Sequence, residues 1–315
     1  MILLNSSRLN RLVLGLLVCF ASYHSDAAEP FVAVLGVAQD GGYPQVGCKK
    51  ACCKNAWMDS AARRHVASLA IVDPESQQRW LLDCTPDFRE QLHLLDQMLP
   101  VDRSPGIDGI FLTHAHMGHY TGLMHLGREV LGAQGVQVYA MSRMRTFLET
   151  NGPWDQLVSL GQIKLTKLAG GQDVSLNERI NVVAFPVPHR DEYSETVGFR
   201  ISGPSKTVIY LPDIDKWERW SVKIEDLLSQ SDYAFLDATF FDVNELPGRD
   251  MSEIPHPFVV ETMERLKALP LLERKKVRFI HLNHSNPLLN PSSTAAVQVE
   301  EAGHWVATQG ERIEI

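Results

Sequence analysis

The sequence has few cysteines, no excess of basic residues and only one long apolar run. Five Cys in 315 residues are too few for a disulfide scaffold. The formal net charge is −8, from 30 Lys and Arg against 38 Asp and Glu, and no basic stripe of the kind that a phosphate backbone requires is present. Nucleic acid is therefore disfavoured as the main partner. We expect a small-molecule substrate, and nothing in the pattern specifies an oligomeric state.

The first 27 residues have the order basic, apolar, small. Arg8 and Arg11 precede the apolar run Leu12–Phe20, and Ala27 and Ala28 follow. This order is typical of a secretory signal peptide, and the run is shorter than the roughly 18 to 20 residues that a spanning helix needs. No later segment is longer. We therefore expect no membrane span, cleavage after Ala27 or Ala28, and a periplasmic or secreted protein; an uncleaved anchor is the alternative.

The rest of the chain, residues 28–315, is expected to form a single domain. Short β-branched segments alternate with segments of helical periodicity, without a repeat or a linker. Strands are expected at Phe31–Val37, Ala67–Val72, Trp80–Asp83, Ile107–Leu112, Val136–Met141, Ile180–Pro186, Thr196–Ile201, Thr207–Leu211, Tyr233–Leu236 and Lys276–His281. Helices are expected after Pro86, Thr121, Arg143, Trp217, His256 and Ser292. Strands that occur both in adjacent pairs and between helices predict two sheets flanked by helices.

Three of the 12 His lie within six residues of one another. His114, His116 and His119 belong to the segment THAHMGH, directly after the apolar strand Ile107–Leu112. Alternation along a strand end lets His114 and His116 point the same way, and His119 returns from the loop or first helical turn that follows. Three imidazoles are costly to bury without a metal or hydrogen bonds. The pattern therefore favours a site for zinc or a neighbouring metal, with a polar surface loop as the alternative.

Three further segments each place a possible metal ligand at the end of an apolar strand. These residues are His189, Asp213 and His281. Each alone could be an ordinary polar residue at a strand end. Together, in the order His-x-His-x-x-His, His, Asp, His, they are much more specific for a metal site.

On these motifs the chain resembles the metallo-β-lactamase superfamily. The resemblance implies an α/β fold, namely an αββα two-sheet sandwich with a one- or two-metal site at one edge. The implied ligands fall into two sets that share one bridging carboxylate: His114, His116 and His189 for the first metal, Asp213 as the bridge, and His119 and His281 for the second. The first motif of the superfamily reads His-x-His-x-Asp-His, and its Asp position is Gly118 here. The resemblance therefore implies a second site with one carboxylate fewer.

A more specific resemblance is to the family of coenzyme PQQ biosynthesis protein B, and it covers most of the chain after the signal segment. The matching stretches are Gly41–Gln45, Thr85–Arg89, Val187–Glu192, Glu195–Phe199, Asp237–Phe240 and Asn283–Pro287.

The segment GCKKACC resembles the Cys-rich loop of the same family and of the related cyclic phosphodiesterase of phosphonate metabolism. There, three cysteines bind a structural zinc together with a histidine three residues after the last histidine of the active site, a spacing that His281 and His284 share. The resemblance implies a structural zinc held by Cys48, Cys52, Cys53 and His284. A disulfide, which export to an oxidising compartment favours, and free thiols are the alternatives.

Two further residues are candidates for supporting roles. His256, in the segment IPHP, matches a histidine with which relatives protonate a leaving group or contact substrate; a loop residue before a helix is the alternative. Asp237 follows the strand Tyr233–Leu236 and is expected either to support a metal ligand or to cap local structure. Asp213 would be catalytic as well as a ligand, because it would orient the attacking water.

Three functions compete on this basis. The leading hypothesis is an exported metal-dependent hydrolase, with one or two zinc ions that activate water against an ester, phosphodiester or lactam-type bond. The more specific family resemblance implies an alternative, an iron-dependent oxygenase or PQQ-linked factor, because histidines with one carboxylate also suit iron. The third is a non-catalytic protein that binds a metal or a quinone.

Overall fold

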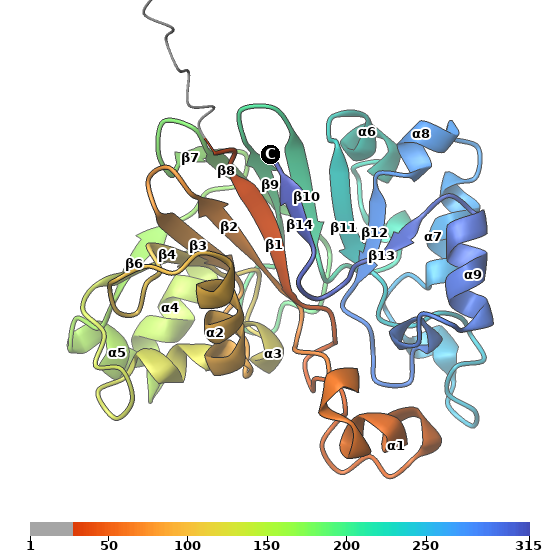
Figure 1. The fold of residues 1–315 in the computed structure, drawn as a ribbon, viewed down its shortest axis with the longest axis horizontal. Helices are drawn as coiled ribbons and strands as arrows, with labels where there is room; N and C mark the ends of the chain where they lie inside the picture. Colours follow the sequence, from red (N-terminus) through yellow and green to blue (C-terminus); the bar gives the residue numbers. More distant parts are fainter. Residues whose placement is uncertain (1–27) are drawn as a thin grey trace, which may run out of the picture.

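The computed structural model describes residues 28–315, which form two sheets of seven strands each (Figure 1). The signal-peptide prediction falls on residues 1–27 and lies outside the described residues. The strands are β1 (Phe31–Gly36), β2 (Ser68–Asp73), β3 (Gln78–Leu82), β4 (Gly109–Phe111), β5 (Val136–Ala140), β6 (Ile163–Lys167), β7 (Asp173–Ser175), β8 (Asn181–Pro186), β9 (Val197–Ser202), β10 (Thr207–Leu211), β11 (Tyr233–Asp237), β12 (Val277–Ile280), β13 (Trp305–Val306) and β14 (Arg312–Glu314).

Helices connect many of these strands and cover the outer faces of the sheets. The α-helices are α1 (Ala51–Met58), α2 (Phe88–Met98), α3 (Met117–Tyr120), α4 (Ser142–Thr150), α5 (Trp154–Ser159), α6 (Ile224–Ser229), α7 (Val259–Leu266), α8 (Leu271–Arg274) and α9 (Thr294–Glu301). Short 3₁₀ helices are η1 (Ser60–Ala62), η2 (Thr121–Leu126), η3 (Trp217–Arg219), η4 (Met251–Glu253) and η5 (Pro287–Leu289). Among the described residues, no helix combines the length and the apolar character that crossing a membrane would need.

The two sheets have matching designs. The first has the order β14-β1-β2-β3-β4-β5-β6 and the second β13-β12-β11-β10-β9-β8-β7. In the first sheet the pairs from β14 to β3 are antiparallel and those from β3 to β6 parallel. In the second sheet β10 to β13 are parallel and β7 to β10 antiparallel. The parallel halves need crossover connections, which the helices supply.

Alternating side chains of β1 show how the layers are held. Val32 and Val34 belong to the core between the two sheets, together with Phe199 and Tyr210 of the second sheet. Ala33 belongs to the core that the first sheet forms with α2, α4 and α5. A third core joins the second sheet to α6, α7 and α9. With both faces of each sheet buried, the layers run helix, sheet, sheet, helix, and the predicted αββα sandwich is confirmed.

The expected strands all form, with ends that differ by a few residues, whereas four further strands were not anticipated. These four, β6, β7, β13 and β14, lie at or next to the edges of the sheets. They are short or carry polar side chains, so their patterns are weak. The segments after Thr121 and Trp217 begin as 3₁₀ helices instead of α-helices. Helix α1 was not anticipated either, and only Cys53 and Ala56 of it are buried.

The candidate site residues share one position in this fold, the segment just after the carboxyl end of a strand. Asp40 follows β1, Asp83 follows β3, His114 follows β4, His189 follows β8, Asp213 follows β10, Asp237 ends β11 and His281 follows β12. The fold thereby collects residues from distant parts of the chain at one end of the two sheets.

Candidate metal centre

The first group of predicted ligands comes together after β4 and β8. His114, His116 and His189 each offer a ligand atom, and these atoms lie within 4.8 Å of one another. Nε2 of His114 is 2.8 Å from Nδ1 of His116. Asp213 borders this group, with Oδ1 3.6 Å from Nε2 of His189. These four residues can therefore reach one ion.

The second group forms on the other side of Asp213. Its Oδ2 lies 3.0 Å from Nε2 of His119 and 3.2 Å from Nε2 of His281. The loop after β1 adds Asp40, whose Oδ1 is 3.1 Å and 3.4 Å from the same two nitrogens. Asp40 was not among the predicted ligands. Its only sequence signal is its position a few residues after a buried strand, directly before the Gly41–Gln45 stretch.

Several atoms at the centre of this cluster are buried without a hydrogen-bond partner among the described residues. They are Nε2 of His119 and His189, and Oδ2 of Asp213. Unpaired buried polar atoms are costly. Because imidazole nitrogens and carboxylate oxygens are the donors that zinc and its neighbours bind, the arrangement fits a metal.

The opposite ring nitrogens of four histidines are held in place. Two of them contact threonine hydroxyls: Nδ1 of His114 is 2.9 Å from Thr113 Oγ1, and Nδ1 of His281 is 3.0 Å from Thr239 Oγ1. The other two contact carboxylates: Nδ1 of His119 is 2.8 Å from Asp83 Oδ2, and Nδ1 of His189 is 3.3 Å from Asp215 Oδ1. Such contacts orient ligand rings and leave Nε2 for a metal. Of these partners, the sequence analysis did not anticipate Asp83 or Asp215, because neither lies in a motif.

Two of the residues around the cluster have a strained backbone. Asp83 has a φ of 67° and His281 a φ of 65°, values that residues with a side chain rarely adopt. Each lies directly after a strand and turns its side chain toward the cluster. Strain of this kind persists only where the surrounding structure over-determines it, which is common at functional sites.

The charges of the cluster suit metal binding. Burial lowers the pKa of His114 well below its usual value and lowers that of His116 to about 4, so both imidazoles are neutral near pH 7. Burial raises the pKa of Asp213, but the neighbouring imidazoles of His281, His119 and His189 outweigh it and hold the pKa well below its usual value. His114 and His116 thus offer neutral imidazoles and Asp213 an ionised carboxylate, the protonation states that a metal requires. Burial lowers the pKa of His119, but the carboxylates of Asp83, Asp213 and Asp40 outweigh it and raise the pKa well above its usual value.

His256 and Asp237 form a buried pair beside the first group. Nδ1 of His256 is 2.7 Å from Oδ2 of Asp237 and 3.7 Å from Oδ1 of Asp213. Burial lowers the pKa of His256, but the carboxylate of Asp237 outweighs it and raises the pKa to about 9. Asp237 also accepts hydrogen bonds from the backbone N–H groups of Ile214 and Thr239. Its contacts therefore agree with local capping, and the side chain that it supports is His256, which was not a predicted metal ligand.

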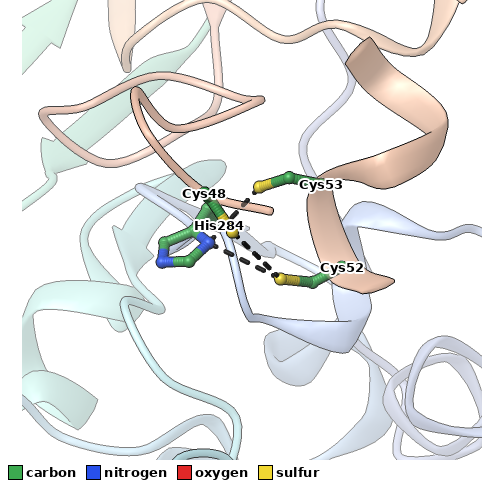
Figure 2. Close-up of side chains that lie close together, drawn as sticks. All are labelled: Cys48, Cys52, Cys53 and His284. Carbon is green, nitrogen blue, oxygen red and sulfur yellow. Dashed lines mark hydrogen bonds between the residues drawn. The ribbon is translucent and has the colours of Figure 1, made fainter. Parts of the chain in front are cut away.

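A second cluster lies at α1, apart from the sheets (Figures 1 and 2). Nδ1 of His284 is 3.4 Å from Sγ of Cys53 and 3.6 Å from Sγ of Cys52, and Sγ of Cys48 is 3.8 Å from that of Cys52. Figure 2 shows the side chains pointing toward one another. Cysteines 48, 52, 53 and 84 are all free in the described chain. The four grouped side chains match the donors of a tetrahedral zinc site.

Comparison with known proteins supports the resemblance. The family model of the Beta-lactamase superfamily domain matches residues 78–282. Coenzyme PQQ synthesis protein B from Methylorubrum extorquens (strain PA1) is 27% identical over 311 residues, which cover 89% of this chain and 98% of that protein.

Solved structures show the same architecture. The structure of Zn(2+)-bound PqqB from Methylobacterium extorquens superposes with a TM-score of 0.76 at 22% identity, covering 90% of this chain and all of the other. A diphosphatase from the PhnP family superposes with a TM-score of 0.61 at 22% identity, covering 91% of this chain and 98% of the other. At these identities the likeness shows the fold alone.

Proposed function

The chain belongs to the β-lactamase superfamily, and from this premise we propose that it is a metal-dependent hydrolase that acts on an ester, phosphodiester or lactam-type bond of a small molecule. One observation carries the proposal. The unpaired Nε2 atoms of the buried His119 and His189 face the carboxylate of Asp213, whose Oδ2 is also unpaired. Their Nδ1 atoms are held by other carboxylates. Such a preoriented donor set is costly for the fold unless a cation occupies its centre.

The proposed ligands are the histidines of the two groups, with Asp213 between them: His114, His116 and His189, then His119 and His281. A zinc ion bound by them would lower the pKa of a water molecule to about 7 and polarise the bond to be cleaved. The ionised carboxylate of Asp213 would accept a hydrogen bond from that water and so orient it.

His256 is proposed as the proton donor to the leaving group. Its Nδ1 is engaged by Asp237, which leaves Nε2 for the substrate. The buried Asp237 carboxylate stabilises the protonated ring, and a positioned acid of this kind contributes about 10²- to 10⁴-fold to a hydrolysis rate. Arg190 adds positive charge near His116. The positive charges of His256 and Arg190 both favour a substrate with an anionic group near the scissile bond.

We further propose that Cys48, Cys52, Cys53 and His284 hold a structural zinc. Burial raises the pKa of the Cys53 thiol to about 12, so a thiolate at this position needs a cation beside it. If the cluster binds zinc, titration of the mature protein under denaturing chelation will find all four cysteines as reactive thiols. A disulfide would remove two of them.

The expected export also remains a proposal. Intact mass of the protein after expression in a bacterial host would test it, because cleavage after Ala27 or Ala28 shortens the chain by a defined mass. A retained residue 1 would contradict it.

A second candidate function is a PQQ-linked reaction with iron in the histidine site. The observation in its favour is the similarity to coenzyme PQQ synthesis protein B over nearly the full length of that protein. Oxygen uptake by iron-loaded protein with a tyrosine-derived or quinone substrate would distinguish it from a hydrolase.

The test of the leading proposal combines metal content with hydrolysis. Protein purified without added metal should contain zinc, and it should hydrolyse at least one compound in a panel of phosphodiesters, carboxylic esters and lactams. His116→Ala should reduce that rate by more than the about 10- to 100-fold that loss of a ligand-supporting group typically causes. Asp102→Asn is the control, since it changes an exposed side chain outside both clusters. Unchanged hydrolysis by His116→Ala would reject the proposal.

A further inference from the structure

We propose that Asp40 supplies the carboxylate that the superfamily motif places at the position of Gly118, so that the catalytic centre holds two metal ions. This inference rests on the proposed metal-dependent function and adds a ligand to it. The carboxylate would come from the loop after β1 instead of from the His-x-His-x-x-His segment itself. The second ion would then have Asp40, His119 and His281 as ligands, with Asp213 shared between the two ions.

Asp40 leaves no room for a side chain at position 118. A Cβ atom added to Gly118 would lie 2.4 Å from Oδ1 of Asp40 and 2.6 Å from its Cα and Cγ. Distances below 3.0 Å are not tolerated between such atoms. The Asp40 side chain thus occupies the space in which a side chain at position 118 would begin. Because residue 118 is glycine and has no side chain, the carboxylate of Asp40 can reach the metal centre.

The distances suit a shared ion. Oδ1 of Asp40 and Oδ2 of Asp213 each lie 3.0 to 3.4 Å from Nε2 of His119 and of His281. Ligand atoms about 2.1 Å from a tetrahedral zinc are separated by about 3.4 Å, so the group needs little rearrangement to bind one.

The contacts of His119 also suit a cation. Its Nδ1 faces the buried carboxylate of Asp83 and donates a proton to it. Its Nε2 lies 3.1 Å from Oδ1 of Asp40 and 3.0 Å from Oδ2 of Asp213, and it has no hydrogen-bond partner in the described chain. A divalent ion binds the ring nitrogen and both carboxylates at once.

A carboxylate from Asp40 weakens the hypothesis of a non-catalytic binding protein. Gly118 favours a non-catalytic binding protein, because it removes a carboxylate from the second site. With Asp40 in that place the donor set of the second site is complete, and the argument for a degenerate centre is lost.

The experiment is zinc titration of metal-free full-length mature protein by calorimetry, together with elemental analysis after dialysis. Wild type should bind two zinc ions in the histidine centre in addition to the cysteine-bound ion. Asp40→Ala should bind one fewer, or bind it at least about 100-fold more weakly, the upper end of what loss of a supporting group alone causes. Asp40→Asn keeps the size of the side chain and removes its charge, so it should weaken the same site. Asp102→Asn, which removes an exposed loop carboxylate, is the control and should behave as wild type.

Cobalt(II) substitution gives a readout that is independent of activity. Two cobalt ions bridged by Asp213 should show magnetic coupling in wild type, and Asp40→Ala should lose it while the thiolate charge-transfer band of the cysteine cluster is retained. The Asp40 side chain is 37% exposed, so the alanine variant is expected to fold, and circular dichroism checks this.

The possible failures are distinguishable. If Asp40→Ala and Asp40→Asn bind the same number of zinc ions as wild type with the same affinity, Asp40 is not a ligand and the inference is wrong, while the proposed hydrolase stands. If wild type itself binds no metal in the histidine centre, the proposed function and this inference fall together.

Discussion

The histidine centre and the cysteine cluster differ in what holds their side chains in place. The ligands of the histidine centre follow strand ends of two buried sheets, and most of their rings have a second contact, such as Asp83 to His119. In the cysteine cluster, three of the four candidate ligands lie on or just before α1, a helix that buries only Cys53 and Ala56. The first site is preorganised by the fold, whereas the second depends on its own ligands and the ion they would bind.

Removal of the cysteine ligands is the strongest test of this difference between the two sites. Cys48→Ser/Cys53→Ser should lose the structural zinc and lower the free energy of opening α1 by several kcal/mol, because binding energy in small metal-held units is folding energy. Hydrogen exchange of the α1 amides measures this. His116→Ala is the matched control and should leave α1 protected. Equal protection of α1 in the serine variant and in wild type would mean that its packing alone holds it.

A weaker perturbation tests whether the histidine centre is held by the fold. Asp83 is fully buried and accepts hydrogen bonds from Thr113 N and Oγ1 at 2.8 and 2.9 Å, besides contacting His119. Asp83→Asn leaves one acceptor oxygen, so its amide NH₂ would face either the Thr113 donors or Nδ1 of His119. We therefore expect a loss of about 2 to 4 kcal/mol in the free energy of unfolding. Zinc affinity should fall by about 10- to 100-fold. Urea unfolding of the metal-free protein measures the first effect, with Asp102→Asn as control. A stability loss that appears only with zinc bound would indicate that the metal, and not the fold, organises this centre.

The smallest expected effect is at Asp215, which supports His189 from a more exposed position. Its carboxylate contacts Nδ1 of His189 at 3.3 Å and is paired with the exposed Arg219 at 2.9 Å. Asp215→Asn should lower zinc affinity about tenfold and change the free energy of unfolding by no more than about 0.5 kcal/mol. The same titration and urea unfolding measure both quantities. A stability loss as large as that of Asp83→Asn would show that exposure does not separate the two supporting carboxylates.

The success of the sequence analysis followed the strength of the local pattern. Buried strands such as β1 and β10 were predicted because apolar runs identify them, while β13 and β14 were missed because two or three edge residues carry little pattern. The histidines of THAHMGH were recognisable as candidate ligands because three lie within six residues. Asp40 and Asp83 were not recognised as site residues, because nothing near them in the chain marks them as polar partners of His119.

Apolar periodicity in the sequence predicted two sheets flanked by helices, and the spacing of the histidines predicted a metal site, because both are local properties. The resemblance of the motifs to the superfamily implied the αββα sandwich and the donors of the cysteine cluster. Only the tertiary structure decided which carboxylates meet which histidines. It brings Asp40 into the space left open at Gly118 and places Asp83 behind His119, because strand ends that are distant in the chain meet at the same end of two packed sheets. That meeting depends on strand order and sheet packing, which no single segment encodes.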